Sequence, residues 1–206
     1  MGRGKYIVLE GPEGGGKSTH LRLLAKFLSK KGLNILTTRE PGGTEIGEAI
    51  RKLIKLFPGG FSPEGNLLAF ATQRAELFNQ KIIPSLEQGI WVISDRSKYS
   101  TEAYQGAGED IPLETIQMVN NISCRGITPD LTFILDVPTE VGLLNETEKD
   151  NISDRAKSFH EKVRNAYLNI ASRNPDCSLI DYIEGDIPGM QSQMQRILCE
   201  RCSLDY

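Results

Sequence analysis

A glycine-rich stretch near the N-terminus constrains the fold of this chain more than any other feature. It fits the phosphate-binding loop pattern of two glycines flanking four residues, followed by Lys and then Ser or Thr. An apolar, β-branched run at 6–9 precedes it, and apolar residues at helical spacing follow it over 21–28. The sequence therefore predicts a strand, a phosphate-binding loop and a helix in that order. The residues of the loop are Gly11, Pro12, Glu13, Gly14, Gly15, Gly16, Lys17, Ser18 and Thr19.

The residue types in this loop suit a polyphosphate. Glycine lets the backbone turn its N–H groups inward, and these amides together with the helix N-terminus hold the anion. Lys17 would place its charge on the β- and γ-phosphates, and the Ser18 hydroxyl would ligate Mg²⁺. A glycine-rich turn that binds nothing is the alternative, and the complete spacing with its flanks disfavours it.

Further apolar runs of strand type lie at 33–37, 90–93, 131–135 and 179–183, with helical patterns between them. Strands that alternate with helices predict an α/β fold in which a five-stranded parallel sheet is flanked by helices on both faces. A turn-rich stretch at 57–63 separates two helices, and the second helix is expected over about 64–86. With 206 residues, the chain is predicted to form one domain over 1–206.

Composition argues against some classes of function. The net charge of −3 disfavours a nucleic-acid partner, because backbone phosphates require a basic face. No stretch is long and apolar enough for a membrane span or a signal peptide, which predicts no membrane partner and a cytoplasmic location. Free thiols are favoured over metal or redox roles, because nothing completes the lone Cys-x-x-Cys at 199–202. The four cysteines are Cys124, Cys177, Cys199 and Cys202.

Polar side chains follow the predicted strands at their carboxyl ends, where ligands gather in open parallel sheets. Asp95 ends an apolar strand, as does the acid that supports Mg²⁺ in phosphate-loop enzymes; a helix cap or a surface partner for Arg96 is the alternative. Arginine is the side chain that grips a second phosphate bidentately, although any one arginine alone is more often a solvated surface residue. The candidates are Arg39, Arg51, Arg74 and Arg96.

A polar stretch follows the fourth predicted strand and its short helix. Enzymes that transfer phosphoryl groups must exclude water, usually with a lid that carries arginines. The segment at about 144–156 is the candidate lid, and Lys149 and Arg155 are its basic residues before position 156. An ordinary solvated loop is the alternative.

In their order along the chain, these motifs resemble those of the thymidylate kinase family. The resemblance covers most of the chain, and the more similar subtype has no arginine within the loop and relies on lid arginines. The segments that carry it are the loop at 11–19, Arg-Glu-Pro-Gly-Gly-Thr at 39–44, Phe70 with Arg74, Asp95-Arg96, Ser-Thr-Glu-Ala-Tyr-Gln-Gly at 100–106, and the stretches at 129–132, 135–137 and 159–167.

The resemblance implies a three-layer P-loop NTPase fold of the nucleoside monophosphate kinase type. It implies ATP-dependent phosphorylation of dTMP to dTDP with Mg²⁺, with ATP bound by the loop at 11–19. Family members are commonly homodimers, so a homodimer is expected. The implied catalytic residues are Lys17, Asp95, Arg96 and Arg155, with Ser18 and Asp95 at the metal.

For the acceptor, the resemblance implies further roles. Glu13 would meet the sugar 3′-hydroxyl, and Arg39 and Arg96 would hold the monophosphate. Phe70 would stack on the thymine ring, and Arg74 would hydrogen-bond the base. The remaining pocket residues would be Arg51, Ser100, Thr101, Tyr104 and Gln105, of which Arg51 would help to close the pocket.

Two departures from the family pattern keep other functions open. Asn145 and Thr147 stand where lid arginines are expected, and Asp-Arg-Ala-Lys at 154–157 replaces Asp-Arg-Ile-Glu. Ser97 follows Arg96 where an aromatic or similarly large residue is usual. The alternatives are a kinase for another or a modified deoxynucleoside monophosphate, and a nucleotide-binding protein with little catalysis.

Overall fold

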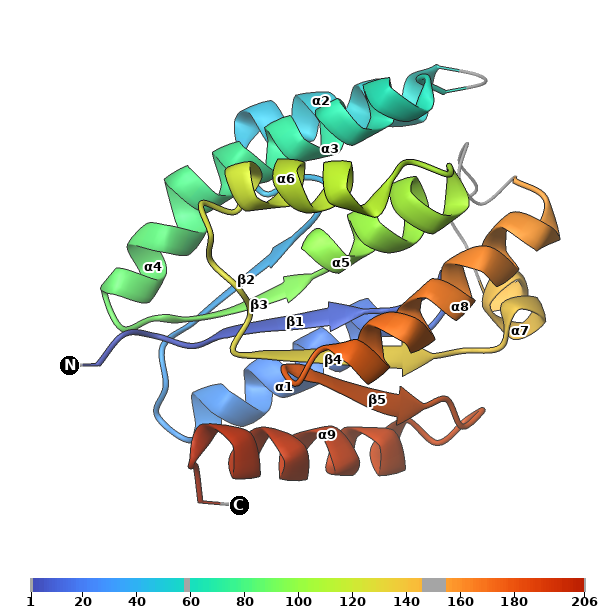
Figure 1. Ribbon diagram of the computed structural model, residues 1–206. Helices are drawn as coiled ribbons and strands as arrows, with labels where there is room; N and C mark the ends of the chain where they lie inside the picture. The colour runs from blue at the N-terminus through green and yellow to red at the C-terminus, as the bar shows by residue number, and fades with distance from the viewer. Residues whose placement is uncertain (1, 58–59, 146–154, 206) are drawn as a thin grey trace.

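The protein is built on one parallel β-sheet of five strands, described here from a computed structural model that covers residues 2–57, 60–145 and 155–205. The strand order across the sheet is β2-β3-β1-β4-β5, so the first strand lies in the middle (Figure 1). Every neighbouring pair is parallel. The strands are β1 (Tyr6–Glu10), β2 (Ile35–Arg39), β3 (Trp91–Asp95), β4 (Leu131–Asp136) and β5 (Cys177–Asp181).

Helices cover both faces of the sheet and make three layers (Figure 1). On one face, α1 (Lys17–Lys30) and α9 (Ile187–Cys202) pack against the strands through leucines and methionines. On the other face and beyond the carboxyl ends of the strands lie the remaining helices, which carry most of the polar residues discussed below. They are α2 (Glu45–Leu56), α3 (Pro63–Leu77), η1 (Phe78–Ile82), α4 (Ile83–Glu87), α5 (Lys98–Thr101), η2 (Glu102–Gly108), α6 (Leu113–Ser123), α7 (Thr139–Asn145) and α8 (Lys157–Arg173).

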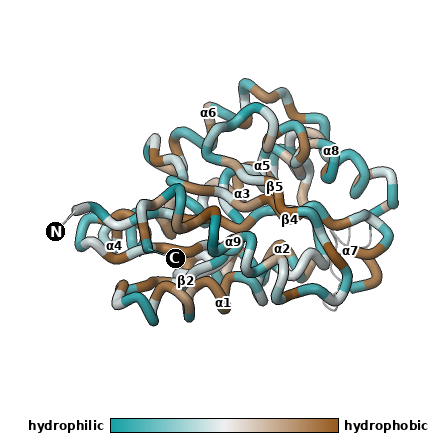
Figure 2. The backbone as a smooth tube through the Cα atoms, turned by 90° about the horizontal axis from the view of Figure 1, so that it is seen from below, coloured by the Kyte–Doolittle hydropathy of each residue, from teal (hydrophilic) through white to brown (hydrophobic). Residues whose placement is uncertain are grey.

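The central strands form the core because both of their faces are covered. All five residues of β1 are buried, and so are the first five of β4. In Figure 2 the chain is brown around β4, whereas much of α8 is teal. Continuous apolar strands of this kind are expected in a parallel sheet buried on both sides. The predicted α/β class and five-stranded parallel sheet are confirmed.

The bounds of β2 and β5 differ most from those predicted. The second strand begins at Ile35 and runs on to Arg39, so its polar carboxyl end belongs to the ladder with β3. The fifth lies at Cys177–Asp181 instead of 179–183, because its register with β4 buries Cys177 and Ile180, whereas Ile183 is exposed. The sequence-based prediction extended this strand to Ile183 because that residue is apolar.

The long helix predicted over about 64–86 is a continuous helical run with a change of winding inside it. It begins at Pro63, where the Ser62 side chain accepts a hydrogen bond from the backbone N–H of Gly65. The five-residue π-helix η1 joins α3 to α4 immediately before Pro84. Proline lacks an N–H and its ring crowds the preceding turn, and wider winding accommodates it.

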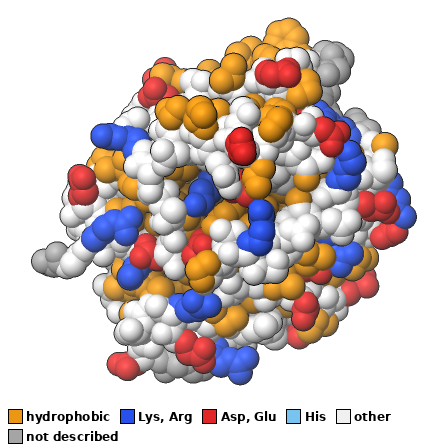
Figure 3. Space-filling model, in the orientation of Figure 1, with side chains coloured by type: hydrophobic (Ala, Val, Ile, Leu, Met, Phe, Trp, Pro, Cys, Tyr) orange, Lys and Arg blue, Asp and Glu red, His pale blue; other side chains and the backbone are white. Residues whose placement is uncertain are grey.

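Several apolar side chains on the outer surface remain exposed. They include Leu68 on α3, and Met118 and Ile122 on α6. Figure 3 shows orange side chains gathered over the part of the molecule where these helices lie, in the same orientation as Figure 1. Exposed apolar patches on proteins of this size often mark interfaces.

Two properties bear on the expectations drawn from composition. Across the described ranges, no helix combines the length and apolar character that a bilayer crossing requires. The four cysteines are free thiols, and Cys202 is the least buried of them. Most of the predicted lid, at 146–154, lies outside the described residues, and the one-domain organisation stays a prediction.

Candidate active site

The predicted phosphate-binding loop lies between the carboxyl end of β1 and the N-terminus of α1. Gly14 adopts a φ of 64°, and a Cβ there would collide with the carbonyl oxygen of Gly142 on α7. Gly11 adopts a φ of 136°, and a Cβ there would lie 2.5 Å from the Leu135 carbonyl oxygen. Only glycine combines this backbone with such a close approach, so the loop packs directly against the end of β4 and the start of α7.

Lys17 turns back over the loop that precedes it. Its Nζ donates to the carbonyl oxygens of Gly11 at 3.1 Å and Pro12 at 2.5 Å. Burial and the nearby Arg96 guanidinium lower the pKa of Lys17 to about 8. An ammonium group that is destabilised by desolvation and by a second cation favours an anionic ligand, and polyphosphate fits that requirement.

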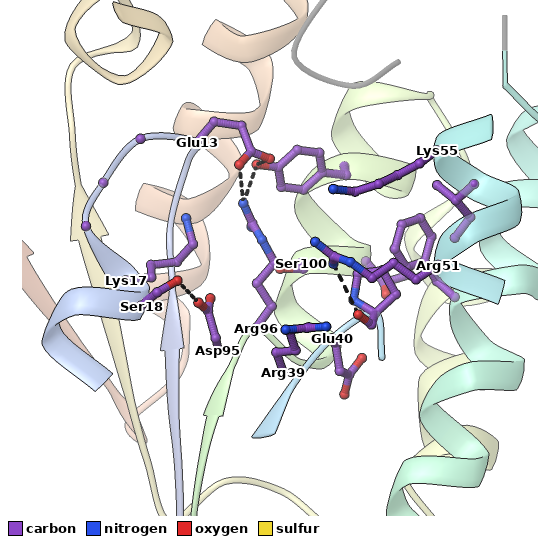
Figure 4. A pocket seen from close by; sticks show the side chains of 18 of the residues that line it. Glu13, Lys17, Ser18, Arg39, Glu40, Arg51, Lys55, Asp95, Arg96 and Ser100 are labelled. Atoms are coloured by element: carbon purple, nitrogen blue, oxygen red, sulfur yellow. Dashed lines mark hydrogen bonds and ion pairs between the residues drawn. The ribbon is translucent and has the colours of Figure 1, made fainter. Parts of the chain in front are cut away.

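Ser18 and Asp95 meet at the edge of the sheet although 77 positions separate them. The Ser18 hydroxyl donates to Asp95 Oδ2 at 2.6 Å (Figure 4). The meeting follows from topology, because Asp95 ends β3 and pairs in register with Leu9 of β1, two residues before the loop. One hydroxyl and one carboxylate oxygen suit Mg²⁺, which usually keeps waters and substrate oxygens as its other ligands. Among the described residues, no cluster of three or more acidic, histidine or cysteine side chains could hold a metal.

Arg96, which follows β3, forms an ion pair with Glu13 of the phosphate-binding loop. Arg96 Nη2 lies 2.9 Å from Glu13 Oε2, and the Arg96 guanidinium also stands 5.0 Å from the centre of the Tyr104 ring. Burial raises the pKa of Glu13, but the charges of Arg96 and Lys17 outweigh it and lower the value to about 2. Glu13 is therefore ionised at neutral pH and orients Arg96.

Glu10 is a site residue that sequence reasoning missed. Its fully buried carboxylate accepts hydrogen bonds from the backbone N–H groups of Ser97 (2.8 Å) and Ser100 (3.0 Å). It also accepts from the hydroxyls of Ser100 (2.6 Å) and Tyr167 (2.9 Å). Burial raises the pKa of Glu10, and these four donors favour its charged form. The sequence did hold a signal for Glu10, because it is a charged residue at the end of an otherwise apolar strand, directly before the loop.

This set of contacts fixes the backbone that follows β3. Arg96 adopts a left-handed φ of 71°, which is uncommon for a residue with a side chain, and its N–H donates to the carbonyl of Leu9 at 2.8 Å. Such a conformation persists only where the surroundings hold it in place. Glu10 holds the next turn and thereby sets where the Arg96 and Ser100 side chains stand.

The loop and these side chains surround one cavity of about 500 Å³. Most of the predicted site residues line it, and they come from the loop, β2, α2, α3, the end of β3, α5 and η2 (Figure 4). The predicted residues along the cavity are Glu13, Gly14, Gly15, Gly16, Lys17, Ser18, Thr19, Arg39, Arg51, Phe70, Asp95, Arg96, Ser100, Thr101, Tyr104 and Gln105. The others along it are Glu40, Pro41, Ile54, Lys55 and Asn145.

Basic side chains approach the cavity from α2 as well. Arg51, Ile54 and Lys55 all line it, and Arg51 Nη1 donates to the Pro41 carbonyl at 3.2 Å. The spacing of three and four residues places all three on one helix face. That spacing could have identified Ile54 and Lys55 once Arg51 was a candidate. From β2, Arg39 adds a guanidinium that Glu48 holds at 3.0 Å.

Arg74 lies behind the cavity wall rather than along it. Its side chain is 1% exposed, and Nε donates to Glu40 Oε2 at 2.7 Å. Its Nη1 donates to Thr101 and Asn120, and Nη2 to the carbonyl of Ser97. Four of the five N–H groups of Arg74 are thus used by the protein. The predicted hydrogen bond from Arg74 to a base stays a prediction. Within the described residues, one N–H group of Arg74 is left to make it.

Arg155 also stands outside the residues that line the cavity. Its Nη2 donates to Glu109 Oε1 at 2.6 Å, and its guanidinium lies 4.5 Å from the centre of the Phe159 ring. The predicted catalytic role of Arg155 therefore requires it to leave this position. Thr147 and Lys149 lie outside the described residues.

Ser97 is not among the residues that line the cavity. Its side chain is fully buried, and its Oγ accepts a hydrogen bond from the Tyr6 hydroxyl at 2.9 Å. Tyr6 reaches this point from the start of β1, where its ring packs edge-on against Phe78. The small side chain of Ser97 is thus in contact with the large side chain of Tyr6, which comes from β1.

Comparisons with known proteins relate this chain to one family. The family model described as thymidylate kinase matches residues 9–184. A thymidylate kinase of Carboxydothermus hydrogenoformans is 40% identical over 172 residues, covering 82% of this chain and 85% of the relative. That of Thermosipho melanesiensis is 38% identical over 195 residues, covering 94% and 96%. A crystal structure of thymidylate kinase from Ehrlichia chaffeensis superposes with a TM-score of 0.80 at 33% identity, covering 95% of this chain and 99% of that one.

Proposed function

This chain belongs to the thymidylate kinase family, and from that premise we propose how its residues transfer the γ-phosphoryl group of ATP to dTMP, giving dTDP. The observation that supports the assignment is that one cavity receives both the phosphate loop and the arginines of a second anion site. Two phosphates held end to end, with positive charge over the group in transit, are what phosphoryl transfer requires.

The donor end is formed by the loop and α1. The amides of the loop and the Lys17 ammonium hold the β- and γ-phosphates of ATP. Ser18 and Asp95 would hold Mg²⁺, which neutralises charge that develops on the phosphates. As the polyphosphate binds, Lys17 exchanges its two carbonyl partners for phosphate oxygens, and the incoming charge raises its pKa again.

The acceptor end is formed by the opposite wall of the cavity. Arg39 and Arg96 would hold the monophosphate of dTMP, and Arg51 lines the same cavity. Phe70 offers an aromatic face to the thymine ring. Glu13, held by Arg96, is an ionised acceptor for the sugar 3′-hydroxyl.

We further propose that the active form is a homodimer in the cytoplasm. The exposed apolar residues Leu68, Met118 and Ile122 on α3 and α6 support the dimer, because burying such side chains against a second copy removes them from water. Replacing Met118 and Ile122 by Glu should give a monomer by analytical ultracentrifugation. A double variant that sediments as the wild type does would contradict this use of the surface.

The decisive experiment measures ADP release with ATP, Mg²⁺ and each deoxynucleoside monophosphate in turn, with Lys17→Ala as the blank. Release with dTMP above all others is expected. Preferential release with another monophosphate would reassign the acceptor, and binding without release would make the chain a nucleotide-binding protein. Omission of Mg²⁺ with excess chelator should abolish the signal.

A further inference from the structure

Glu109 is a carboxylate in an unusual environment at the end of η2. Its side chain is 3% exposed. Glu109 Oε1 accepts hydrogen bonds from Arg155 Nη2 at 2.6 Å and from Asn66 Nδ2 at 2.8 Å. Glu109 Oε2 is buried and has no hydrogen-bond partner within the part of the chain that the structure describes. Arg155 is therefore the charge that compensates this carboxylate.

The position of Arg155 is set from a second side by an aromatic ring. The guanidinium lies 4.5 Å from the centre of the Phe159 ring on α8, and 28% of the Arg155 side chain is exposed. The Phe159 ring is packed tightly against η2, because a Cβ on Gly108 would lie 2.5 Å from it. An ion pair and a cation–π contact together hold Arg155 in one place.

That place is beside the cavity but not in it. Gln105, one turn before Glu109 on η2, lines the cavity, whereas neither Glu109 nor Arg155 does. If Arg155 supplies charge to the phosphoryl group in transit, as the family resemblance implies, it must first give up its ion pair with Glu109. Breaking the pair leaves a buried carboxylate without its cation, which is costly.

We propose that Glu109 is a positioning residue for Arg155, holding the arginine outside the cavity and thereby setting the cost of its entry. This inference rests on the proposed phosphoryl transfer and on the catalytic role that the family resemblance implies for Arg155. The cost is met when the phosphates of both substrates attract the guanidinium more strongly than Glu109 does. Burial raises the pKa of Glu109, so this carboxylate can also take up a proton when Arg155 leaves.

The test is Glu109→Gln, which keeps the shape of the side chain and the capacity to accept from Asn66 but removes the charge. The rate of phosphoryl transfer in a single turnover, at saturating ATP and dTMP, should rise about two- to fivefold, the range expected for losing a partly exposed ion pair. The KM for dTMP should not change. Asp110→Asn is the matched control, because Asp110 is the next residue, is 78% exposed and pairs with Lys162 instead.

A structural role for Glu109 predicts a different pattern, and the Arg155→Ala background separates the two. If Glu109 acts through Arg155, Glu109→Gln has no effect on the rate once Arg155 is absent. A rate that falls in Glu109→Gln, or that changes equally in both backgrounds, overturns the proposal. Thermal unfolding of each variant checks that the fold persists.

Failure of the proposed function would have its own signature. A wild-type chain that binds ATP and dTMP without transfer would overturn the catalytic assignment. The same variants would then be compared by their affinity for ATP, where the restraint on Arg155 predicts about two- to fivefold tighter binding in Glu109→Gln. Equal affinities in both proteins would overturn the restraint as well.

Discussion

The two ends of the cavity hold their cations in different ways. At the donor end, Lys17 donates to backbone carbonyls, and within the described residues it forms no ion pair. Around the acceptor end, four arginines are each held by a glutamate. The pairs are Arg39–Glu48, Arg74–Glu40, Arg96–Glu13 and Arg155–Glu109.

The difference has a physical consequence for what each end can bind. Carbonyl oxygens orient an ammonium without neutralising it, so Lys17 keeps its positive charge for the polyphosphate. A glutamate neutralises its arginine, fixes the plane of the guanidinium, and must be displaced or shared when substrate arrives. The donor end therefore selects its ligand by negative charge, whereas the acceptor end selects its ligand by geometry.

The largest expected effect comes from the most buried pair. Glu40→Gln neutralises the partner of Arg74 while both side chains are 1–2% exposed, and it leaves a buried guanidinium without its counter-charge. Removal of one member of a buried pair costs about 3–5 kcal/mol of unfolding free energy. Urea unfolding monitored by circular dichroism measures the loss. A loss below about 1 kcal/mol would mean that Thr101, Asn120 and the Ser97 carbonyl suffice to hold Arg74.

The next effect tests the donor end. Lys17→Ala should lower kcat by about 10²–10³-fold, the range found when one preorganised donor to a transition state is removed. The fold should persist, because its two carbonyl partners belong to the loop itself. Lys26→Ala, an exposed lysine on the same helix, is the control. Full activity in the Lys17 variant would contradict the assignment of the loop.

The pH dependence should distinguish free and ATP-bound protein. The pKa of Lys17 is about 8 in the folded chain, below its ordinary value of 10.5. The neutral amine therefore predominates above pH 8. We expect kcat/KM for ATP to fall about tenfold per pH unit above that value, whereas kcat at saturating ATP should not, because bound phosphate raises the pKa.

Rising pH should affect the stability of the fold in the opposite direction to its effect on kcat/KM for ATP. Between pH 8 and 10.5 the unfolded chain binds more protons at Lys17 than the folded one, so this residue makes the folded state more stable as pH rises. Thermal melts across this range, compared between wild type and Lys17→Ala, should show the contribution only in the wild type. A fall in kcat/KM for ATP without this stability gain would assign the titration to another group.

The contrast between the two ends also explains what could be predicted from sequence. The donor end is local: the loop, its strand and its helix occupy consecutive residues, so their pattern could be read directly. The acceptor end depends on pairings between distant positions. Arg74 was identified as a site residue, but its burial depends on Glu40, 34 positions earlier, and no local pattern reports that partner.

Glu10 and Ser97 teach the same lesson. Glu10 reads as the end of an apolar strand, and its role appears only when β3 lies beside β1 and brings the backbone of Ser97 to it. The small side chain of Ser97 kept other acceptors open, and its hydrogen bond with Tyr6, 91 positions away, could not be predicted from a local pattern. Strand order, which the apolar runs do not specify, decides both.

The smallest expected effect comes from the most exposed pair and sharpens the comparison most. Arg39 and Glu48 are 55% and 40% exposed, and their hydrogen bonds are 3.0 and 3.1 Å long. Glu48→Gln makes the same chemical change as Glu40→Gln but in water, where such a pair contributes at most about 1 kcal/mol. Unfolding free energy should change by less than that. The KM for dTMP should fall by up to about twofold, because Arg39 no longer has to leave a carboxylate to hold the monophosphate. A rise in KM would instead mean that Glu48 preorganises Arg39 for the acceptor, so that the glutamates at this end orient their arginines more than they compete for them.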